Sequence, residues 1–351
     1  MRKNDMFGLL LLAFVIGCRV HTPLADLYAE KCYPVISDGF SRIASIFPFS
    51  LEEIVVICFV LAFIFVLVRA VRKKEGFLRW LGGTARVTMW LIVWFYIGWG
   101  INYFRTPLYP RMGIERVSYD ENTFSHFLSD YTKALNNASE EAVSWNWEEL
   151  EADVREFYST TLPEYGYTYL HHWQDVKDPL LNRLYSAVGV LGFMGPFFCE
   201  SQLNLELPDL EYPFTLAHEL AHLAGVTSEA EANYWAYVYC RQSEDPAVRY
   251  SGYLSLLPHA AASAGSLLSE ERYGEWAATV ADKVKEDYAE TSRLWEKRRI
   301  GIINTVQRWM MDRFLKTNGV SEGAKDYYGV IGMIITFSSF SPQPERTGAY
   351  W

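Results

Sequence analysis

The sequence predicts an α+β protein that is mainly α-helical with a small β-sheet, in which three amino-terminal transmembrane helices precede one further domain. Long apolar runs lie within residues 1–104, and most of the remainder has apolar residues at helical spacing. Hydrophobic residues also make up 50% of the 351 residues, and aromatic residues 16%. These shares are high for a purely soluble protein, and membrane helices account for them.

Three apolar runs are the predicted spans: residues 6–20, 51–71 and 87–104. About twenty apolar residues cross a bilayer as a helix, and the second run fits this length best. The first run is shorter and follows Arg2 and Lys3, so it is either an uncleaved helix or the apolar part of a cleaved signal peptide. The third run is rich in tryptophan and tyrosine toward its end, which is typical of a membrane interface.

Basic residues orient these spans. Besides the two before the first span, they crowd the segment between the second and third, as Arg69, Arg72, Lys73, Lys74, Arg79 and Arg86. Short loops rich in lysine and arginine stay on the cytoplasmic side. We therefore predict a membrane domain at residues 1–104, in the cytoplasmic membrane, and an extracytoplasmic domain at residues 105–351.

Charge and cysteine content exclude some classes of protein. The net charge is −10 and the isoelectric point is near 5.3, so we expect no nucleic-acid partner, because phosphate backbones attract basic faces. The five cysteines include no C-x-x-C pair, so they indicate no disulfide or metal framework. An extracytoplasmic location permits a disulfide between Cys199 and Cys240, which is the lesser alternative.

The second domain begins with a linker at residues 105–113, where prolines interrupt the helical pattern. Residues 115–162 have the spacing of two helices, and residues 167–170 and 186–193 have strand-like runs. The chain after residue 233 is largely helical. The apolar run at residues 327–340 is short for a span, so we expect a buried helix there, with a fourth span as the alternative.

The stretch from Thr215 to Gly225 contains the strongest functional motif, His218-Glu219-x-x-His222. Two histidines four residues apart project from one helix face and are good zinc ligands, and the carboxylate beside them is placed to accept a proton from water. The surrounding leucines and alanines predict a buried helix, and a bound cation lowers the cost of burying these polar groups. The other interpretation is that solvent or backbone carbonyls satisfy both histidines.

A third ligand is expected shortly after this helix. Gly225 is suited to end the helix, and Ser228 with Glu231 has the spacing of a capping box that opens the next one. If Glu231 folds back to the backbone of Ser228, Glu229 is left for the metal, and Asn233 lies one turn on, where it can orient a ligand. Glu229 is the narrow preference, and Glu231 remains the alternative.

These residues resemble two groups of proteins. His218-Glu-x-x-His222 followed by Glu229-x-x-x-Asn233 is similar to the gluzincin class of zinc peptidases, although Asn233 stands where an Asp is usual and only six residues separate His222 from Glu229. Over nearly its full length the chain resembles a family of bacterial membrane proteins of unknown function. The shared segments are Phe47-Pro-Phe-Ser50, Pro213 to His222, Glu229 to Asn233, Tyr250-Ser-Gly-Tyr253 and Leu315 to Val320.

The resemblance implies a zincin-like metallopeptidase fold and an uncleaved first helix. In that class an extended edge strand precedes the metal-binding helix and pairs with the substrate backbone. Residues 188–202 occupy this place here, and an ordinary core strand is an equally good interpretation. The sequence supplies three candidates for the donor to the reaction's oxyanion, Tyr253, Tyr250 and His259, with Tyr253 slightly favoured. The adjacent His171 and His172 point to different faces and make a poor metal pair.

The function that we expect is that of a membrane-anchored zinc metallopeptidase. His218, His222 and Glu229 would hold Zn²⁺, Glu219 would serve as general base, and the partners would be the lipid bilayer and a peptide or envelope-protein substrate. Two alternatives remain open from the sequence. One is a non-catalytic zinc-binding membrane sensor or scaffold, and the other is a zinc amidohydrolase that acts on cell-wall or lipid amides.

Overall fold

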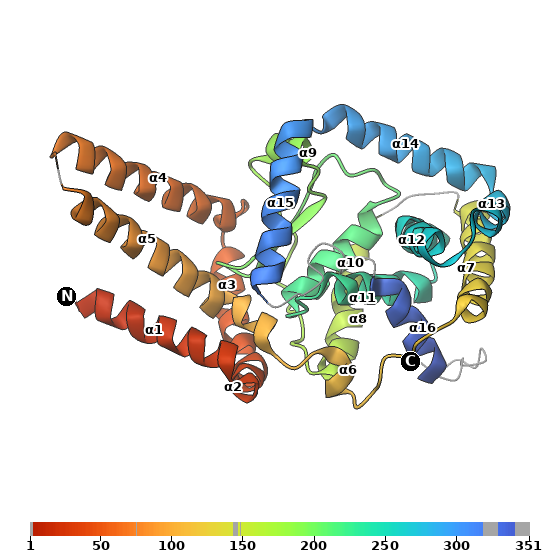
Figure 1. The fold of residues 1–351 in the computed structure, drawn as a ribbon, viewed down its shortest axis with the longest axis horizontal. Coiled ribbons are helices and arrows are strands. Elements are labelled where there is room, and N and C mark those ends of the chain that lie inside the picture. Colours follow the sequence, from red (N-terminus) through yellow and green to blue (C-terminus); the bar gives the residue numbers. More distant parts are fainter. Residues whose placement is uncertain (1–2, 75, 143–146, 148, 319–328, 341–351) are drawn as a thin grey trace.

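The computed structural model describes residues 3–74, 76–142, 147, 149–318 and 329–340. It confirms a mainly helical protein with a small sheet (Figure 1). The first elements are α1 (Lys3–Val20), α2 (Thr22–Leu27), the π-helix η1 (Tyr28–Cys32), α3 (Tyr33–Ala44), α4 (Leu51–Arg72), α5 (Phe77–Gly98) and the 3₁₀ helix η2 (Gly100–Phe104). They are followed by α6 (Leu108–Arg111), α7 (Glu121–Glu141), α8 (Leu150–Thr161), the 3₁₀ helix η3 (Leu162–Tyr165) and α9 (Asn182–Val188). The remaining elements are β1 (Gly192–Gly195), β2 (Glu200–Leu203), α10 (Tyr212–Leu223), α11 (Glu229–Gln242), α12 (Pro246–Leu267), α13 (Glu270–Thr279), α14 (Asp282–Arg298), α15 (Gly301–Thr317) and α16 (Val330–Phe340).

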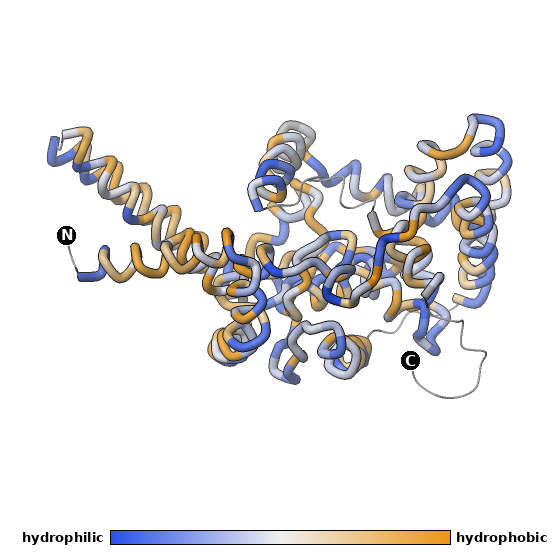
Figure 2. The backbone as a smooth tube through the Cα atoms, turned by 60° about the horizontal axis from the view of Figure 1, so that its bottom comes forward, coloured by the Kyte–Doolittle hydropathy of each residue, from blue (hydrophilic) through white to orange (hydrophobic). Residues whose placement is uncertain are grey.

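Three apolar helices, α1, α4 and α5, project from one side of the helical body, and we call them the stem (Figure 1). Apolar residues make up much of their length (orange in Figure 2). The Ser50 side chain caps α4 by accepting a hydrogen bond from the Glu53 N–H, and Arg86 pairs with Asp5 at 2.7 Å, which ties α5 to α1. The basic turn between α4 and α5 lies at the end of the stem that is far from the body.

The prediction of three separate membrane spans is wrong for the described helices. By length and hydropathy α4 alone is able to cross a membrane, and a second span is counted only if α1 and the segment Thr22–Ala44, bent by 114°, are one. The predicted span at 87–104 is not a single helix, because α5 ends at Gly98 and η2 follows. Arg79 and Arg86, with several tryptophans, also reduce the hydropathy of α5.

The body is built around α10. Ten of its 12 residues are buried, and α8, α11, α12 and the hairpin of β1 and β2 pack around it. The hairpin is antiparallel and pairs Gly192 with Leu203 and Gly195 with Glu200. A continuous hydrophobic core includes Tyr28, Tyr33 and Trp99 together with the leucines and alanines of α10. The segment between α1 and α4 and the residues that follow α5 therefore belong to the body's core.

The second domain largely has the helices that the sequence predicts. α7 and α8 account for residues 115–162, α11 carries the third ligand candidate, and α16 is a buried helix whose first six residues are inaccessible or nearly so. Residues 327 and 328 of the predicted closing run lie outside the described residues. The linker at 105–113 contains the short helix α6.

Two predicted strands differ from the structure. Residues 167–170 form no strand, because the Thr168 N–H donates to the carbonyl of Ala224 at 3.0 Å and holds the segment against the end of α10. Residues 186–188 belong to α9, which ends at Gly189 with a φ of 74°. This left-handed conformation suits glycine and redirects the chain into β1.

Candidate metal centre

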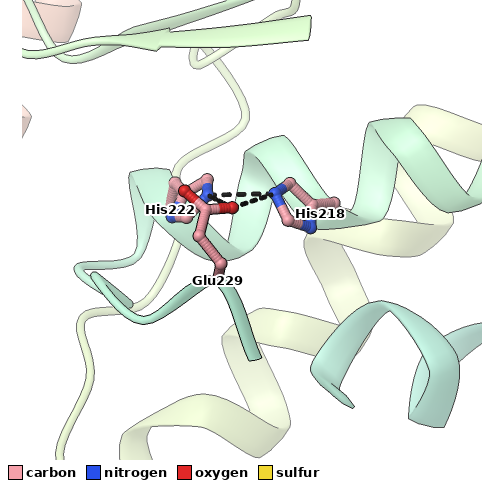
Figure 3. A group of neighbouring side chains, drawn as sticks. All are labelled: His218, His222 and Glu229. Atoms are coloured by element: carbon pink, nitrogen blue, oxygen red, sulfur yellow. Dashed lines mark hydrogen bonds and ion pairs between the residues drawn. The ribbon is translucent and has the colours of Figure 1, made fainter. Parts of the chain in front are cut away.

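Three candidate ligands come together where α10 meets α11. His218 and His222 lie one turn apart on α10, and Glu229 is the first residue of α11. The Nε2 atoms of the two histidines are 3.0 Å apart. Glu229 Oε2 lies 3.3 Å from His218 Nε2 and 3.6 Å from His222 Nε2. One ligand atom from each residue is thus within 4.8 Å of the others (Figure 3).

A tight turn sets this convergence. Gly225 has a φ of 99°, and its N–H donates to the carbonyl of His222 at 2.9 Å. A Cβ at this position would be strained and would lie 3.1 Å from the Tyr33 ring. Ser228 then begins α11 by accepting a hydrogen bond from the Glu231 N–H. The chain reverses within five residues and carries Glu229 back to the histidines.

The backbone orients the His222 ring. The carbonyl of Val226 lies 2.7 Å from His222 Nδ1, and because a carbonyl only accepts hydrogen bonds, Nδ1 carries a proton. Nε2 is thereby directed to the cluster, as in metal-binding histidines whose second nitrogen is held by a carbonyl. His218 Nδ1 is buried and has no hydrogen-bond partner among the described residues.

The electrostatics of the cluster favour a bound cation. Burial would lower the pKa of His222, but the Glu229 carboxylate outweighs burial and raises that pKa to about 9. Burial would likewise raise the pKa of Glu229, and the two imidazoles reverse this effect and hold it well below its ordinary value. Two imidazole nitrogens and one carboxylate oxygen are the donor set of many catalytic zinc sites. The residues present therefore have the donor atoms that a divalent cation such as zinc requires.

Glu231, the alternative third ligand, points elsewhere. Its carboxylate accepts a hydrogen bond from the Tyr167 hydroxyl, and Arg105 and Arg111 lie over the Tyr167 ring at 4.9 and 4.4 Å. Burial raises the pKa of Glu231, while Tyr167 and Arg111 oppose that rise. Ser228 supplies its side of the predicted capping box by accepting from the Glu231 N–H, while the Glu231 carboxylate is held by Tyr167.

Glu219, the candidate base, lies between the ligand cluster and β1. A Cβ added to Gly192 would lie 2.6 Å from Glu219 Cγ and 2.8 Å from Oε1, so the strand backbone contacts the carboxyl group. Burial raises the pKa of Glu219, and the two histidines and the Met194 N–H oppose that rise. The Ser201 hydroxyl donates to the Glu219 carbonyl at 3.3 Å and fixes α10 against β2. The sequence indicates Glu219 as the candidate base, but it does not predict the contact with Gly192.

Aromatic residues from the end of the stem enclose the other side of the site. Trp99 Nε1 donates to the carbonyl of His222 at 2.9 Å, and the Trp99 ring contacts Tyr103 edge-on with centroids 5.2 Å apart. Burial raises the pKa of Tyr103, and the charge of Glu229 adds to this effect. The sequence contains no signal for this contact, since Trp99 and Tyr103 are about 120 residues from the motif and read as interfacial aromatics.

The expected oxyanion donors lie on α12, each in different surroundings. The Tyr250 hydroxyl donates to Asp287 Oδ2 at 2.6 Å. Tyr253 packs against Tyr237 and Tyr131, with ring centroids 5.8 and 6.2 Å apart. His259 is half-buried on the same helix.

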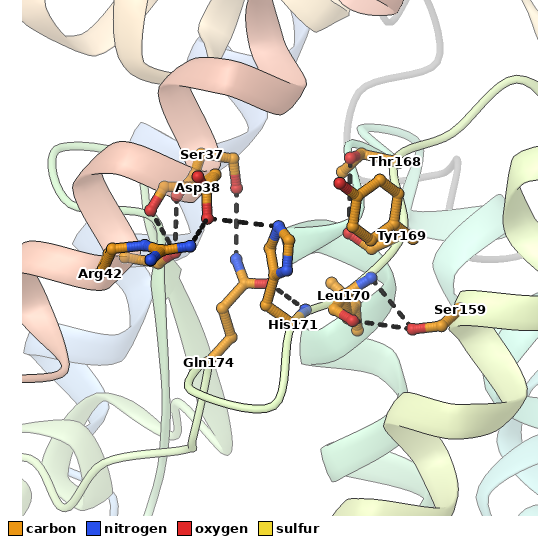
Figure 4. Close-up of polar contacts among 10 residues, drawn as sticks. Ser37, Asp38, Arg42, Ser159, Thr168, Tyr169, Leu170, His171 and Gln174 are labelled. Carbon is orange, nitrogen blue, oxygen red and sulfur yellow. Dashed lines mark hydrogen bonds and ion pairs between the residues drawn. The ribbon is translucent and has the colours of Figure 1, made fainter.

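His171 has a polar partner and is not part of the candidate centre (Figure 4). Its Nε2 lies 3.3 Å from Asp38 Oδ1, and its ring stacks on Trp173 at 4.0 Å. Burial lowers the pKa of His171, and Asp38 partly compensates. His172 packs edge-on against the same Trp173 ring, with ring centroids 4.8 Å apart. Both histidines are accounted for by packing, in line with the sequence interpretation.

One further expectation differs from the structure, and one lesser alternative, the Cys199–Cys240 disulfide, does not occur in it. Asn233 is buried one turn beyond Glu229, but its Nδ2 makes no hydrogen bond to any described residue, so it does not orient a ligand through that atom. Cys199 and Cys240 are both buried and free. The disulfide is absent because Cys199 lies at the hairpin, where its thiol faces the carbonyl of Gly98 at 3.5 Å, whereas Cys240 packs against Gly252 of α12.

Comparisons with known proteins give one family. No curated protein and no solved structure matches the chain. One family model, described as a protein of unknown function (DUF3810), matches residues 28–335. This range contains the stem helices α4 and α5, the hairpin, and both helices of the candidate metal centre. The chain therefore belongs to the DUF3810 family of proteins of unknown function.

Proposed function

We propose that this protein is a membrane-anchored, zinc-dependent metallopeptidase of gluzincin type. The convergence of His218, His222 and Glu229 within 4.8 Å is the observation that carries the proposal. It is supported by Glu219, whose buried carboxyl group lies between these ligands and the β1 backbone. A structural zinc site is usually closed by a fourth protein ligand, and among the described residues only these three form such a group.

The candidate residues have separate roles in peptide-bond hydrolysis. His218, His222 and Glu229 would hold Zn²⁺, which acts as a Lewis acid and makes water more acidic at neutral pH. Glu219 accepts a proton from the water that attacks the peptide carbonyl and delivers it to the leaving nitrogen. The pKa of Glu219, raised by burial, moves toward neutrality and suits it to both steps. Tyr103 is a further candidate for the donor to the oxyanion, because it packs on Trp99, which donates to the carbonyl of His222.

The β1 strand supports a peptide substrate. In the described residues it pairs only with β2, so no second strand lies along its other edge beside Glu219. An extended peptide can bind such an edge through main-chain hydrogen bonds. Gly192 allows that backbone to approach the carboxyl group without a side chain between them.

We further propose that α4 crosses the cytoplasmic membrane and that the body lies on the extracytoplasmic side. Arg69, Arg72, Lys73 and Lys74 lie at the end of α4 far from the body. The positive-inside rule assigns that end to the cytoplasm. Labelling of a single cysteine in the body of intact cells by a membrane-impermeant maleimide tests this orientation, and protection of the body in intact but not lysed cells would contradict it.

Glu219→Gln is the decisive variant for the enzymatic proposal. We expect the purified variant to bind one zinc ion per chain, as the wild type does, and to lose hydrolysis of a mixed peptide library by about 10³-fold or more, because the base is removed while the ligands remain. Zinc bound by a wild type that cleaves no peptide would instead favour a zinc-binding scaffold. Release of amines from lipid or cell-wall amides alone would favour the amidohydrolase.

A further inference from the structure

The hairpin that contacts the candidate base is also attached to the membrane stem. A Cβ at Gly195 would lie 2.5 Å from Glu52 Cγ, and the Phe197 N–H donates to Glu52 Oε2 at 2.9 Å. The Phe197 ring lies 5.9 Å from Phe59 of α4 and 5.7 Å from Trp94 of α5. The turn between β1 and β2 is therefore inserted between two stem helices.

This attachment fixes the height of the candidate base above the bilayer. One end of β1, Gly195, contacts the first turn of α4, which is where that helix enters the apolar layer. The other end, Gly192, contacts Glu219. The two glycines are three residue steps apart along the strand, which is about 10 Å. Glu219 thus lies within a few residues' length of the membrane surface.

Exposed leucines lie around the stem at the height of the first turn of α4. The N–H groups of Leu180 and Leu181 donate to the Glu53 carboxylate at 2.5 and 2.9 Å, so the turn before α9 rests on the first turn of α4. The exposed fractions of Leu180, Leu181 and Leu184 are 53%, 41% and 50%. Phe193 on β1 is also exposed. Side chains of this kind at the entry point of a membrane helix are expected to contact lipid.

Helix α15 also lies on the side of the body that faces the stem, because both of its ends are bonded to elements on that side (Figure 1). At its start, the Ile300 N–H donates to the carbonyl of Ala187 in α9 at 2.8 Å. At its end, Arg19 of α1 donates to the carbonyl of Thr317 at 3.0 Å, and the Tyr96 hydroxyl of α5 donates to Asn318 Oδ1 at 2.7 Å.

The outward face of α15 has the pattern of an interfacial helix. Val306, Trp309 and Met310 are spaced at i, i+3 and i+4 and are all more than half exposed. Arg313 and Lys316 follow on the next turn. An apolar stripe with tryptophan and neighbouring basic residues is typical of a helix that lies in the headgroup region of a bilayer.

We propose that these residues form a bilayer-facing rim and that the substrate is the membrane-proximal segment of a membrane-anchored polypeptide. The rim consists of Leu180, Leu181, Leu184, Phe193, Val306, Trp309 and Met310. A chain that leaves the bilayer beside the rim reaches the open edge of β1 after a few extended residues, and its backbone then lies against Glu219. This substrate class rests on the peptidase function proposed above, whereas the rim itself does not.

The rim is tested without an activity assay. Nitroxide labels are attached to Leu184→Cys and, separately, to Trp309→Cys in the full chain in lipid nanodiscs, with the exposed Cys32 and Cys58 replaced by serine and the three buried thiols kept. Tyr288→Cys on α14, a position that is also exposed, is the control. We expect the labels at 184 and 309 to collide preferentially with oxygen and the label at 288 with a water-soluble nickel chelate. Equal nickel access at all three positions would overturn the proposal.

The substrate class is tested with this protein in proteoliposomes that contain zinc. One substrate sequence of mixed composition is supplied in three forms. The sequence is a free peptide, a segment directly next to a transmembrane helix, or a segment separated from that helix by a flexible spacer of about 20 residues, whose mean reach is about 25 Å. We expect the directly linked form to be cut at least about tenfold faster than the spaced form, since only it is held at the height of Glu219. Equal rates for the three forms would overturn this inference and leave the peptidase intact. Cleavage of none would overturn the peptidase and with it the substrate class, while the label experiment would still decide the rim.

Discussion

Gly192→Ala tests whether β1 positions the candidate base. The added Cβ would lie 2.6 Å from Glu219 Cγ and 2.9 Å from Cδ. Carbon atoms prefer a separation of about 3.5 to 4.0 Å, so either the strand or the carboxyl group must move by about 1 Å. The side chain moves at lower cost than a paired strand. A misplacement of about 1 Å can reduce the rate about 100-fold, which corresponds to about 2.7 kcal/mol of transition-state stabilisation.

The assay compares zinc content, kcat and thermal unfolding of this variant with those of the wild type and of Gly274→Ala. Gly274 is a suitable control because a Cβ there meets nothing within 4 Å. We expect Gly192→Ala to bind zinc normally, because Gly192 contacts no ligand, and to lose kcat about 100-fold with a stability cost of about 1–3 kcal/mol. Wild-type kcat in a folded Gly192→Ala protein would refute the role given to the strand and to Glu219 beside it.

Three further predictions concern the metal. Glu229→Ala should lose zinc binding, whereas Glu231→Gln on the same helix should keep it, as equilibrium dialysis against a zinc indicator will show; zinc loss from both variants alike would contradict the assignment of Glu229. Zinc binding at pH 7 should release about one proton, because the pKa of His222 is about 9 in the metal-free cluster and the ion displaces that proton. The apparent affinity should therefore rise with pH up to about 9, and calorimetry in buffers of different ionisation enthalpy measures the release; binding without proton release would count against this protonation state. Finally, zinc at about 100 times its Kd should stabilise the folded protein by about 2.7 kcal/mol, and an unchanged Tm on adding a chelator would show that the folded state does not bind the ion.

The local part of the site follows from the sequence. Helical spacing alone puts His218 and His222 on one face, and Gly225 marks the turn that brings the next helix back. The choice between Glu229 and Glu231 depends on residues far away in the chain. Arg105 and Arg111 flank Tyr167 and draw Glu231 to that cluster, and no pattern within α11 contains this information.

The distant part of the site was not predictable, for a similar reason. Trp99 is of a residue type that is common at membrane interfaces, yet its Nε1 donates to the backbone of α10. The apolar pattern of residues 186–193 is compatible with both a strand and a short helix. In the structure Gly189 separates α9 from β1. The three-span prediction failed because Arg79, Arg86 and several tryptophans reduce the hydropathy of α5, and because the predicted third span runs past the end of α5 into η2.

The buried cluster at the base of α4 makes the anchor part of the folding unit. Lys177 Nζ lies 2.8 Å from Glu200 Oε2, and Glu200 in turn accepts hydrogen bonds from the Ser50 hydroxyl and the Glu52 N–H at 2.8 and 2.7 Å. A chain that begins at residue 105 would leave Lys177 and Glu200 buried without Ser50 and the Glu52 N–H. Deleting the hydrophobic helices to obtain a soluble body would then also remove the support of the β1–β2 hairpin, so the body depends on these helices for its fold.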